Sequence, residues 1–260
     1  STVGSASRRG GVRRDGDAAR GGSVAGTERT CAVAGSSPRE DRSFAAAGRA
    51  VSCILQAPAP VIVCRAEIPI NGIRYVAGNA MMAGSVTANY LHSMGHRRIG
   101  ILWTEPHNRT MRDLVDGFRT YARFNGLETE LLDCATEYGE NALDNTRAFL
   151  HRYLAEVPVL PFSALFVVSD ETAVAALDAL ETEGIRVPQE LSVVTFDDSW
   201  HARHTIPPLT CCKIAANEMG KETARLIMAK VADPEAYKTE MFRFAGEVIE
   251  RESTAPPPKA

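Results

Sequence analysis

Long hydrophobic runs are missing from this chain, since no apolar stretch among its 260 residues approaches the roughly 20 residues that a membrane-spanning helix needs. The opening stretch, STVGSASRRGGVRRDG, carries positive charge but lacks the apolar segment of a secretory signal peptide. An excess of positive charge is missing as well, because the formal net charge is −3, which gives no global basic field for nucleic acid. These absences predict a cytoplasmic protein that does not enter a membrane.

Motifs of metal, nucleotide and nucleophile sites are also missing. The six cysteines form no CxxC pair and show no zinc-ligand spacing, so free thiols in a reducing compartment are expected. The chain has no GxGxxG, no Walker loop and no GxSxG elbow. His201 and His204 could be read as a metal pair, but they fall in a predicted loop with no third ligand nearby. We therefore expect no enzyme: no catalytic residues, no metal and no cofactor.

Residues 1–50 differ in composition from the rest of the chain. They contain no Leu, Ile, Met, Tyr or Trp, and Phe44 is their one aromatic residue. Such a segment cannot bury enough apolar surface to offset its chain entropy, which is about 1–2 kcal/mol per ordered residue. We expect a disordered or atypical N-terminal segment. Its nine arginines are scattered among acids, which favours a solvated tail over an arm that contacts DNA.

From Val51 onward, short apolar runs alternate with stretches of helical spacing. The short runs predict strands at 51–55, 60–64, 99–103, 128–132, 165–168, 191–196, 241–244 and 247–249. The helical spacing predicts helices at 83–94, 111–124, 143–154, 172–183 and 217–232. Strands that alternate with helices of this length indicate an α/β fold with parallel sheets and crossover helices.

The most informative segment is 184–210, GIRVPQELSVVTFDDSWHARHTIPPLT. Gly184 suits a left-handed helix C-cap, and Pro188 cannot continue a helix. The apolar run that follows has the composition of a strand covered on both faces. Asp197 and Asp198 come at its carboxyl end, where open α/β sheets bind ligands. The two acids either accept hydrogen bonds from a ligand or cap the following turn.

Five blocks of the sequence resemble a single known family. They are GIRVPQELSVVTFDD with PPLT (184–210), YLHSMGHRRIG (90–100), GF (117–118), ALFVVSDETA (164–173) and GEVIEREST (246–254). Their order and spacing are similar to those of the effector-binding core of the lactose-repressor/galactose-repressor (LacI/GalR) family of bacterial transcription regulators. The resemblance extends from about Pro60 to Pro257.

The resemblance implies a two-lobed, periplasmic-binding-protein-like fold, with three crossing segments and a small polar ligand (a sugar or nucleoside-like molecule) between the lobes. By position, the first lobe takes residues 51–98 and 214–243, and the second takes 99–213 and 244–257. The first lobe is then incomplete, since residues 1–50 show neither strand nor helix periodicity. The family also implies a homodimer that reaches DNA through an N-terminal helix-turn-helix, which is not recognisable in this chain.

Candidate effector-binding residues follow from the same resemblance. Asp197 matches the family's strand-end acid, which contacts the effector or caps a turn. Ser169 and Asp170 stand where the family has Asn-Asp, and they either contact the ligand or cap the next helix for about 1 kcal/mol. Asn108 and Thr110 align with contact positions in the loop that follows Trp103, whose polar residues usually face the cleft in this family.

Other candidate positions depart from the family pattern or have two interpretations. The family's usual arginine is replaced by Leu114, and Arg112 is expected to take over its role. Tyr138 aligns with an aromatic that stacks on a ring, sugar or base, although a half-exposed loop tyrosine fits equally well. Gly78-Asn79 replaces a common Asp-Asn pair, which removes one carboxylate from the first lobe.

Two questions stay open at this point. A periplasmic-type sugar-binding protein without regulatory DNA binding shares the fold, but the missing signal peptide and the GHRRIG and PPLT blocks favour a regulator. The missing DNA-reading part has three explanations: a fragment, a naturally headless sensor, or a gene whose 5′ portion is read out of frame. The Ala-, Gly-, Arg- and Ser-rich start, which becomes family-like near residue 51, fits the third.

Overall fold

A computed structural model describes residues 52–53, 56, 61–64, 74–106, 108–157, 159–233 and 241–258. The chain divides into two compact units, residues 1–30 and 31–260, and all described residues belong to the second. The predictions for residues 1–50 and most of the strand predicted at 51–55 lie outside the described residues, although Ser52 and Cys53 are helical rather than extended. In the described part, no helix is long and apolar enough to cross a membrane.

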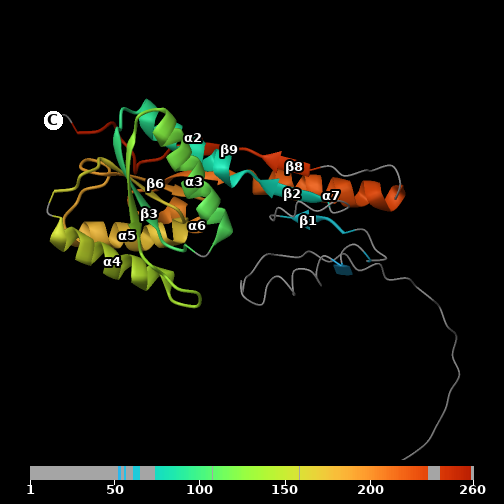
Figure 1. Cartoon of the computed structure of the whole chain (residues 1–260), viewed down its shortest axis with the longest axis horizontal. Helices are drawn as coiled ribbons and strands as arrows, with labels where there is room; N and C mark the ends of the chain where they lie inside the picture. Colours follow the sequence, from blue (N-terminus) through green and yellow to red (C-terminus); the bar gives the residue numbers. More distant parts are fainter. Residues whose placement is uncertain are drawn as a thin grey trace, which may run out of the picture. The chain divides into compact units, whose positions relative to one another are not determined.

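A six-stranded sheet forms the larger part of the described structure (Figure 1). Its strand order is β4-β3-β5-β6-β7-β9, and β9 alone among these strands runs antiparallel to its neighbour. The strands are β3 (Arg98–Trp103), β4 (Glu128–Asp133), β5 (Ala164–Val167), β6 (Ser192–Phe196), β7 (Thr210–Ile214) and β9 (Gly246–Ile249). The parallel order confirms the α/β class that the alternation of strands and helices predicts.

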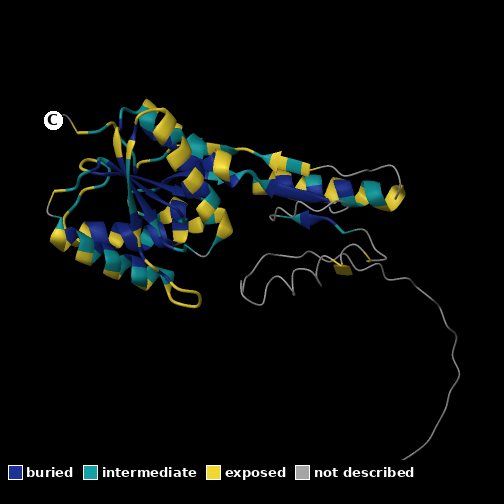
Figure 2. Ribbon diagram, in the orientation of Figure 1, coloured by how far each residue is buried: buried dark blue, intermediate teal, exposed yellow. Residues whose placement is uncertain are grey.

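Helices cover both faces of this sheet (Figure 1). α2 (Ala80–Ser93) and α3 (Arg109–Phe124) pack on one face, and α4 (Ala142–Glu156) and α5 (Asp170–Thr182) pack on the other. Successive side chains of β3 point to opposite faces of the sheet, so Ile101 packs in the core with α2 and α3 and Leu102 packs in the core with α4 and α5. Figure 2 shows the buried sheet between helices whose outer faces are exposed. Burial on both faces explains why the central strands β3, β5 and β6 are largely apolar.

α2 and α3 cross at backbone contact distance through two glycines. A Cβ atom added to Gly84 would lie 2.0 Å from the Leu114 carbonyl oxygen, and one added to Gly117 would lie 1.8 Å from the Met81 carbonyl oxygen. The Ser85 hydroxyl donates to the Gly117 carbonyl at 2.9 Å. The first half of α2 is therefore fixed against the middle of α3.

A second sheet has three parallel strands in the order β1-β2-β8. Its strands are β1 (Val63–Cys64), β2 (Tyr75–Gly78) and β8 (Met241–Phe244). α7 (Ala216–Ala232) contributes Met219 and Leu226 to a small core that also contains Ile62 and Val76. Two separate sheets, one parallel and the other parallel except for β9, confirm the predicted two-lobed α/β fold.

Three short connections join the two sheets along the chain, from β2 to α2, from β7 to α7 and from β8 to β9. The Asn79 N–H donates to the Phe244 carbonyl at 2.9 Å, which links the first connection to the third. A Cβ atom on Gly78 would lie 2.3 Å from Cδ1 of Ile214, so the second connection packs against the first. These contacts place the three connections side by side.

The structure also departs from several expectations. Sequence reasoning does not predict β2, β7 or the short helix α6 (Trp200–His204), so the expectation that His201 and His204 lie in a loop is wrong. β1 covers only the end of the strand predicted at 60–64. α2, which the predicted boundaries put in the first lobe, packs in the core of the six-stranded sheet. The lobe boundaries themselves stay a prediction.

Candidate functional site

The predicted effector-binding residues follow the ends of four neighbouring strands in the large sheet. β4, β3, β5 and β6 are adjacent and parallel, so their carboxyl ends share one edge. The structure thus brings candidates from four separate stretches of sequence to the edge where such sheets bind ligands. They are Asn108, Thr110 and Arg112 after β3, Tyr138 after β4, Ser169 and Asp170 after β5, and Asp197 after β6.

Asp197 is the first residue after β6, and its backbone is left-handed, with φ at +69°. Its N–H donates to the Cys212 carbonyl on β7 at 2.9 Å, which continues the strand pairing by one residue. The left-handed region is uncommon for residues other than glycine, although Asp enters it more readily than most. Strain of this kind, about 1–3 kcal/mol, is concentrated at functional sites, and here it turns the chain sharply where the strand ends.

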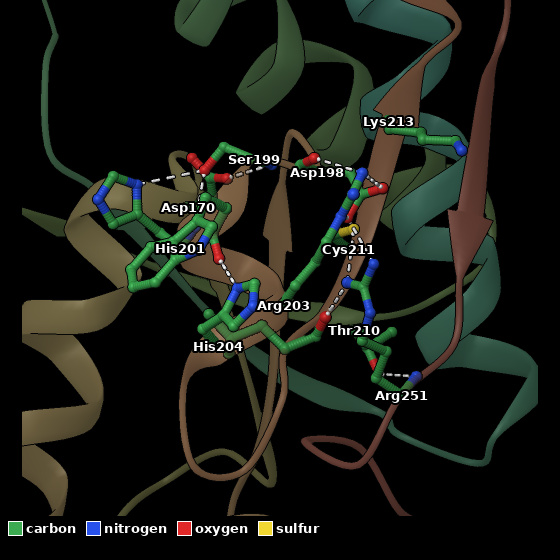
Figure 3. A network of polar contacts seen from close by, with 12 residues as sticks. Asp170, Asp198, Ser199, His201, Arg203, His204, Thr210, Cys211, Lys213 and Arg251 are labelled. Carbon is green, nitrogen blue, oxygen red and sulfur yellow. Dashed lines mark hydrogen bonds and ion pairs between the residues drawn. The ribbon is translucent and has the colours of Figure 1, made fainter.

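Asp198 is held by two arginines (Figure 3). Arg203 of α6 donates Nη2 to Oδ2 at 2.8 Å and Nε to Oδ1 at 3.1 Å, and Arg251, beyond β9, donates Nη2 to Oδ1. Burial would by itself raise the pKa of Asp198, but the hydrogen bonds and charges of the two guanidinium groups outweigh it and hold that pKa below its ordinary value. Because its side chain is only 8% exposed, Asp198 anchors the loop after β6 rather than accepting bonds from a ligand.

Asp170 supports the same loop from the neighbouring strand. Its Oδ2 accepts the backbone N–H of Ser199 at 2.8 Å, and the residue is 7% exposed. Ser169 occupies the N-cap position of α5, yet its side chain makes no capping hydrogen bond. The interpretation of Ser169 or Asp170 as a side-chain cap of this helix is therefore wrong. Their assignment as effector contacts stays a prediction, and Asp170 already has one oxygen engaged.

The start of α3 presents three further candidates. Asn108 caps the helix, since its Oδ1 accepts the Thr110 N–H at 3.0 Å. Thr110 and Arg112 are exposed, and Arg112 donates Nη2 to the Pro106 carbonyl at 3.2 Å. Leu114, where the resembled family has an arginine, is fully buried in the α2–α3 core. That position therefore serves packing, and Arg112 remains the candidate cation among these residues.

One aromatic side chain lies after the end of β4, and another is the last residue of β3. Tyr138, in the turn after β4, is 53% exposed, so its ring is accessible for stacking on a planar ligand or a sugar. Trp103, the last residue of β3, is half-buried, and its indole Nε1 is buried without a hydrogen-bond partner among the described residues. Leaving a buried hydrogen-bond donor without a partner costs about 1–3 kcal/mol, so a ligand acceptor that reached the indole N–H of Trp103 would gain a stabilising hydrogen bond. Sequence reasoning passes over Trp103, although an aromatic residue at a strand's carboxyl end is a usable signal.

The thiols beside this loop are not activated. Cys211 and Cys212 of β7 are buried, and burial raises the pKa of each thiol to about 11, so both stay protonated near neutral pH. Among the residues that the structure describes, no group of three or more His, Cys, Asp and Glu side chains could hold a metal ion.

A pocket of about 320 Å³ lies elsewhere, between α5 and α6. Its walls come from Val174 to Glu181 of α5 and from Trp200 to Ile206, and none of the predicted effector-binding residues lines it. The pocket is thus a separate surface feature, although α6 follows directly on the loop that holds Asp197 and Asp198.

The sequence has recognisable relatives. Residues 88–254 match the model of the periplasmic binding protein-like domain. The chain is 29% identical to the HTH-type transcriptional regulator CelR of Thermobifida fusca over 164 residues, which is 63% of this chain and 47% of the relative. It is 27% identical to the HTH-type transcriptional repressor PurR of Haemophilus influenzae over 150 residues, 57% of this chain and 43% of the relative. The chain thus spans about half the length of the curated relatives that it matches.

Solved structures show the same fold. A LacI family transcriptional regulator from Enterococcus faecium with bound ribose matches with a TM-score of 0.63 at 22% identity, covering 76% of this chain and 71% of that one. A complex of the transcriptional regulator CelR with cellobiose matches with a TM-score of 0.61 at 27% identity, covering 75% and 58%. A sugar-binding transcriptional regulator of the LacI family from Escherichia coli matches with a TM-score of 0.67 at 22% identity, covering 82% and 73%.

Proposed function

The chain belongs to the LacI/GalR family of transcriptional regulators, and we propose that it acts as the effector-sensing core of such a regulator. Its homologues are regulators and not enzymes. The proposed effector is a small polar molecule, a sugar or a nucleoside-like compound. The structures of relatives with bound ribose and cellobiose support this ligand class.

The observation that carries the proposal is the gathering of polar and aromatic side chains at one edge of the large sheet. Asp197, in its left-handed conformation, is the proposed acceptor for ligand hydroxyl or amine groups. Arg112 and Asn108 at the start of α3 supply donors, and Tyr138 supplies a ring for stacking. Trp103 adds an indole N–H that lacks a partner among the described residues. Such a set suits a neutral ligand with several hydroxyl groups better than an ionic one.

Ser169, Asp170 and Thr110 complete the proposed site in a different way. The Asp170 carboxylate holds the Ser199 N–H and so fixes the loop that carries Asp197. Ser169 and Thr110 present short hydroxyl side chains at the first turns of α5 and α3. We propose that these three residues shape and line the site, with fewer direct ligand bonds than Asp197.

Regulation would follow from the two-lobed fold. We propose that one lobe is built on the three-stranded sheet and the other on the six-stranded sheet together with α2, and that the ligand binds between them and changes their orientation. A homodimer in the cytoplasm would pass that change to DNA-reading heads outside the described residues. The description of the relatives as HTH-type regulators supports this scheme. A tenfold change in DNA affinity needs about 1.4 kcal/mol of differential ligand binding.

A thermal-shift assay with matched variants tests the proposal. The purified chain is heated with D-ribose, cellobiose, adenosine or guanosine, and at least one compound is expected to raise its Tm, since a ligand at a hundred times its Kd stabilises by about 2.7 kcal/mol. Asp197→Asn should remove this rise, whereas Asp116→Asn, which neutralises an exposed acid on α3, should preserve it. A shift that Asp197→Asn leaves intact would contradict the assigned site.

A further inference from the structure

Arg251 brings a positive charge from the C-terminal part of the chain to the loop that carries Asp197. It lies two residues beyond β9, and its Nη2 donates to Oδ1 of Asp198, the residue directly after Asp197 (Figure 3). The side chain of Arg251 is 17% exposed and that of Asp198 is 8% exposed, so both are largely shielded from water. Such a pair constrains its two partners more firmly than an exposed pair, because solvent and salt screen it less.

Arg251 is itself attached to the large sheet. Its Nη1 donates to the Leu209 carbonyl at 2.6 Å and to Sγ of Cys211 at 3.3 Å. Its backbone N–H donates to the Thr210 hydroxyl oxygen at 2.9 Å. These three partners lie at the start of β7 or directly before it, and all three are buried. The guanidinium group therefore links the Asp198 carboxylate to a buried strand of the sheet.

The other arginine that binds Asp198 makes a different kind of contact. Arg203 donates to both carboxylate oxygens, but its side chain is 55% exposed and it lies on α6, five residues after Asp198. Asp198 and Arg203 thus belong to one continuous segment, so their ion pair sets the internal shape of that segment. The ion pair with Arg251 sets the position of the segment relative to the sheet.

Asp197 depends on contacts of this kind because its backbone is strained. Its φ of +69° is unfavourable for a residue with a side chain, so the surrounding structure has to maintain it. Its own N–H donates to a β7 carbonyl at 2.9 Å, and the Ser199 N–H donates to Asp170 at 2.8 Å. Between these two backbone contacts, the Asp198 side chain is held by Arg251. The residues on both sides of the strained bond are thus fixed.

We propose that Arg251 is a positioning residue of the effector site, which holds Asp197 in its left-handed conformation through the ion pair with Asp198. The inference rests on the proposed function, because Asp197 is the proposed ligand acceptor. It also connects the site to the third connection between the two sheets. β9 begins at that connection, pairs with β7 and leads directly to Arg251. A shift of β9 relative to β6 would therefore move Asp198, and with it Asp197.

Hydrogen–deuterium exchange of the full chain, resolved by residue with NMR, tests the inference without a ligand. The amides of Asp197 and Ser199 are hydrogen-bonded and should exchange slowly in the wild type. Arg251→Gln should accelerate both by about tenfold, the order expected when a hydrogen bond to a charged group is lost, while the amides of β5 stay unchanged. Arg251→Lys keeps the charge but not the planar fork, so it should accelerate them less than Arg251→Gln does.

Thr254→Val is the matched control in the same segment. Thr254 lies three residues beyond Arg251, and its hydroxyl contacts those of Tyr90 at 2.8 Å and Thr210 at 2.9 Å. Valine has nearly the same shape, so it removes these bonds without removing the ion pair of Asp198. Exchange of the Asp197 amide should therefore stay at the wild-type rate.

Ligand titration by calorimetry measures the consequence for binding, with D-ribose, cellobiose, adenosine and guanosine as the probes. For each compound that binds the wild type, Arg251→Gln should raise the Kd by about tenfold, and Arg251→Lys should recover part of the affinity. Thr254→Val should leave the Kd unchanged even where it lowers the Tm. This difference separates positioning of Asp197 from a general loss of stability.

Unchanged exchange of the Asp197 amide in Arg251→Gln overturns the inference, and so does an equal acceleration in Thr254→Val or in the amides of β5. If Arg251→Gln does not fold, Arg251→Lys decides by the same criterion, and a wild-type exchange rate in it overturns the inference. A compound that binds Arg251→Gln with the wild-type Kd contradicts only the positioning role. A chain in which Arg251 controls the exchange of Asp197 but which binds none of the four compounds contradicts only the proposed effector.

Discussion

At the scale of single residues, three consecutive positions after β6 have three different tasks. Asp197 turns the chain and is the proposed ligand acceptor, Asp198 is bound by two arginines, and Ser199 is held through its N–H by Asp170. The sequence alone shows two equivalent acids at a strand end. Their difference depends on Arg203, five residues away from Asp198, and on Arg251, which is 53 residues away and which no local pattern could have indicated.

The left-handed backbone of Asp197 gives a first prediction. Asp197→Ala should destabilise the protein relative to Asp197→Gly by about 1–2 kcal/mol, because glycine adopts positive φ without the Cβ clash that alanine meets. Urea denaturation of the two variants measures the difference. Equal midpoints would show that the turn is not constrained at this residue.

The buried ion pairs of Asp198 give a second prediction. Asp198→Asn should lower the free energy of unfolding by about 2–4 kcal/mol at neutral pH, because it leaves Arg203 and Arg251 without their counter-charge. The pKa of Asp198 is lower in the folded chain than in the unfolded one. Its stabilisation is therefore complete above about pH 4 and is lost as the pH falls further, towards the folded pKa. Denaturation curves at pH 7 and pH 3 should show a smaller pH effect in the variant; an unchanged pH effect would contradict the role of Asp198.

At the scale of elements, long amphipathic helices and buried strands are predictable from periodicity, and short elements are not. α3 and α4 repeat apolar residues over several turns, whereas α6 spans five residues and cannot show a period. β2 reads YVAG and ends in glycine, and β7 contains Lys213 within five residues, so neither has the signature of a buried strand. These segments form strands because they pair with strands that are distant in the sequence.

The crossing of α2 and α3 gives a third prediction. Gly117→Ala should cost about 3 kcal/mol or more, because its Cβ would lie 1.8 Å from the Met81 carbonyl and neither backbone can yield easily. Gly220→Ala in α7 is the control, since a Cβ there meets nothing within 4 Å. That control should stabilise the helix by about 0.5–1 kcal/mol. Thermal unfolding of both variants distinguishes close packing at Gly117 from a general intolerance of glycine substitution. Similar Tm values for the two variants would contradict the close backbone contact between α2 and α3.

The buried His96, which binds the C-terminal segment at Ala255, gives a fourth prediction. His96 is fully buried, with Nδ1 bonded to Ser163 and Nε2 donating to the Ala255 carbonyl. Burial lowers the pKa of His96, and the bond to Ala255 only partly opposes this. The neutral ring is thus the folded form, so stability should be full above about pH 6.5 and fall as the pH drops below that value. In His96→Gln the loss of stability between pH 7 and pH 5 should be smaller, and an equal loss would disprove the role of His96.

At the scale of the whole molecule, the fold class and the family could be predicted from the order of strands, helices and sequence blocks. Parallel sheets follow from the alternation of strands and helices, whereas the order of the strands within each sheet was not predicted. The sizes of the two sheets were not predicted; the sequence predicted an incomplete first lobe, because residues 1–50 show neither strand nor helix periodicity. The pocket between α5 and α6 was not predictable, since Leu177 of α5 and Trp200 of α6 come together only through the packing of the two helices.

The central claim, that an effector binds at the carboxyl edge of the large sheet, is tested most directly by the fluorescence of one tryptophan. Trp103 and Trp200 are the only tryptophans in the chain, so Trp200→Phe leaves Trp103 as the sole reporter at that edge. Titration with D-ribose, cellobiose, adenosine and guanosine should give a saturable change in Trp103 emission with at least one compound, and adding Asp197→Asn should abolish it. No change with any of the four, or a change that survives Asp197→Asn, would contradict the claim.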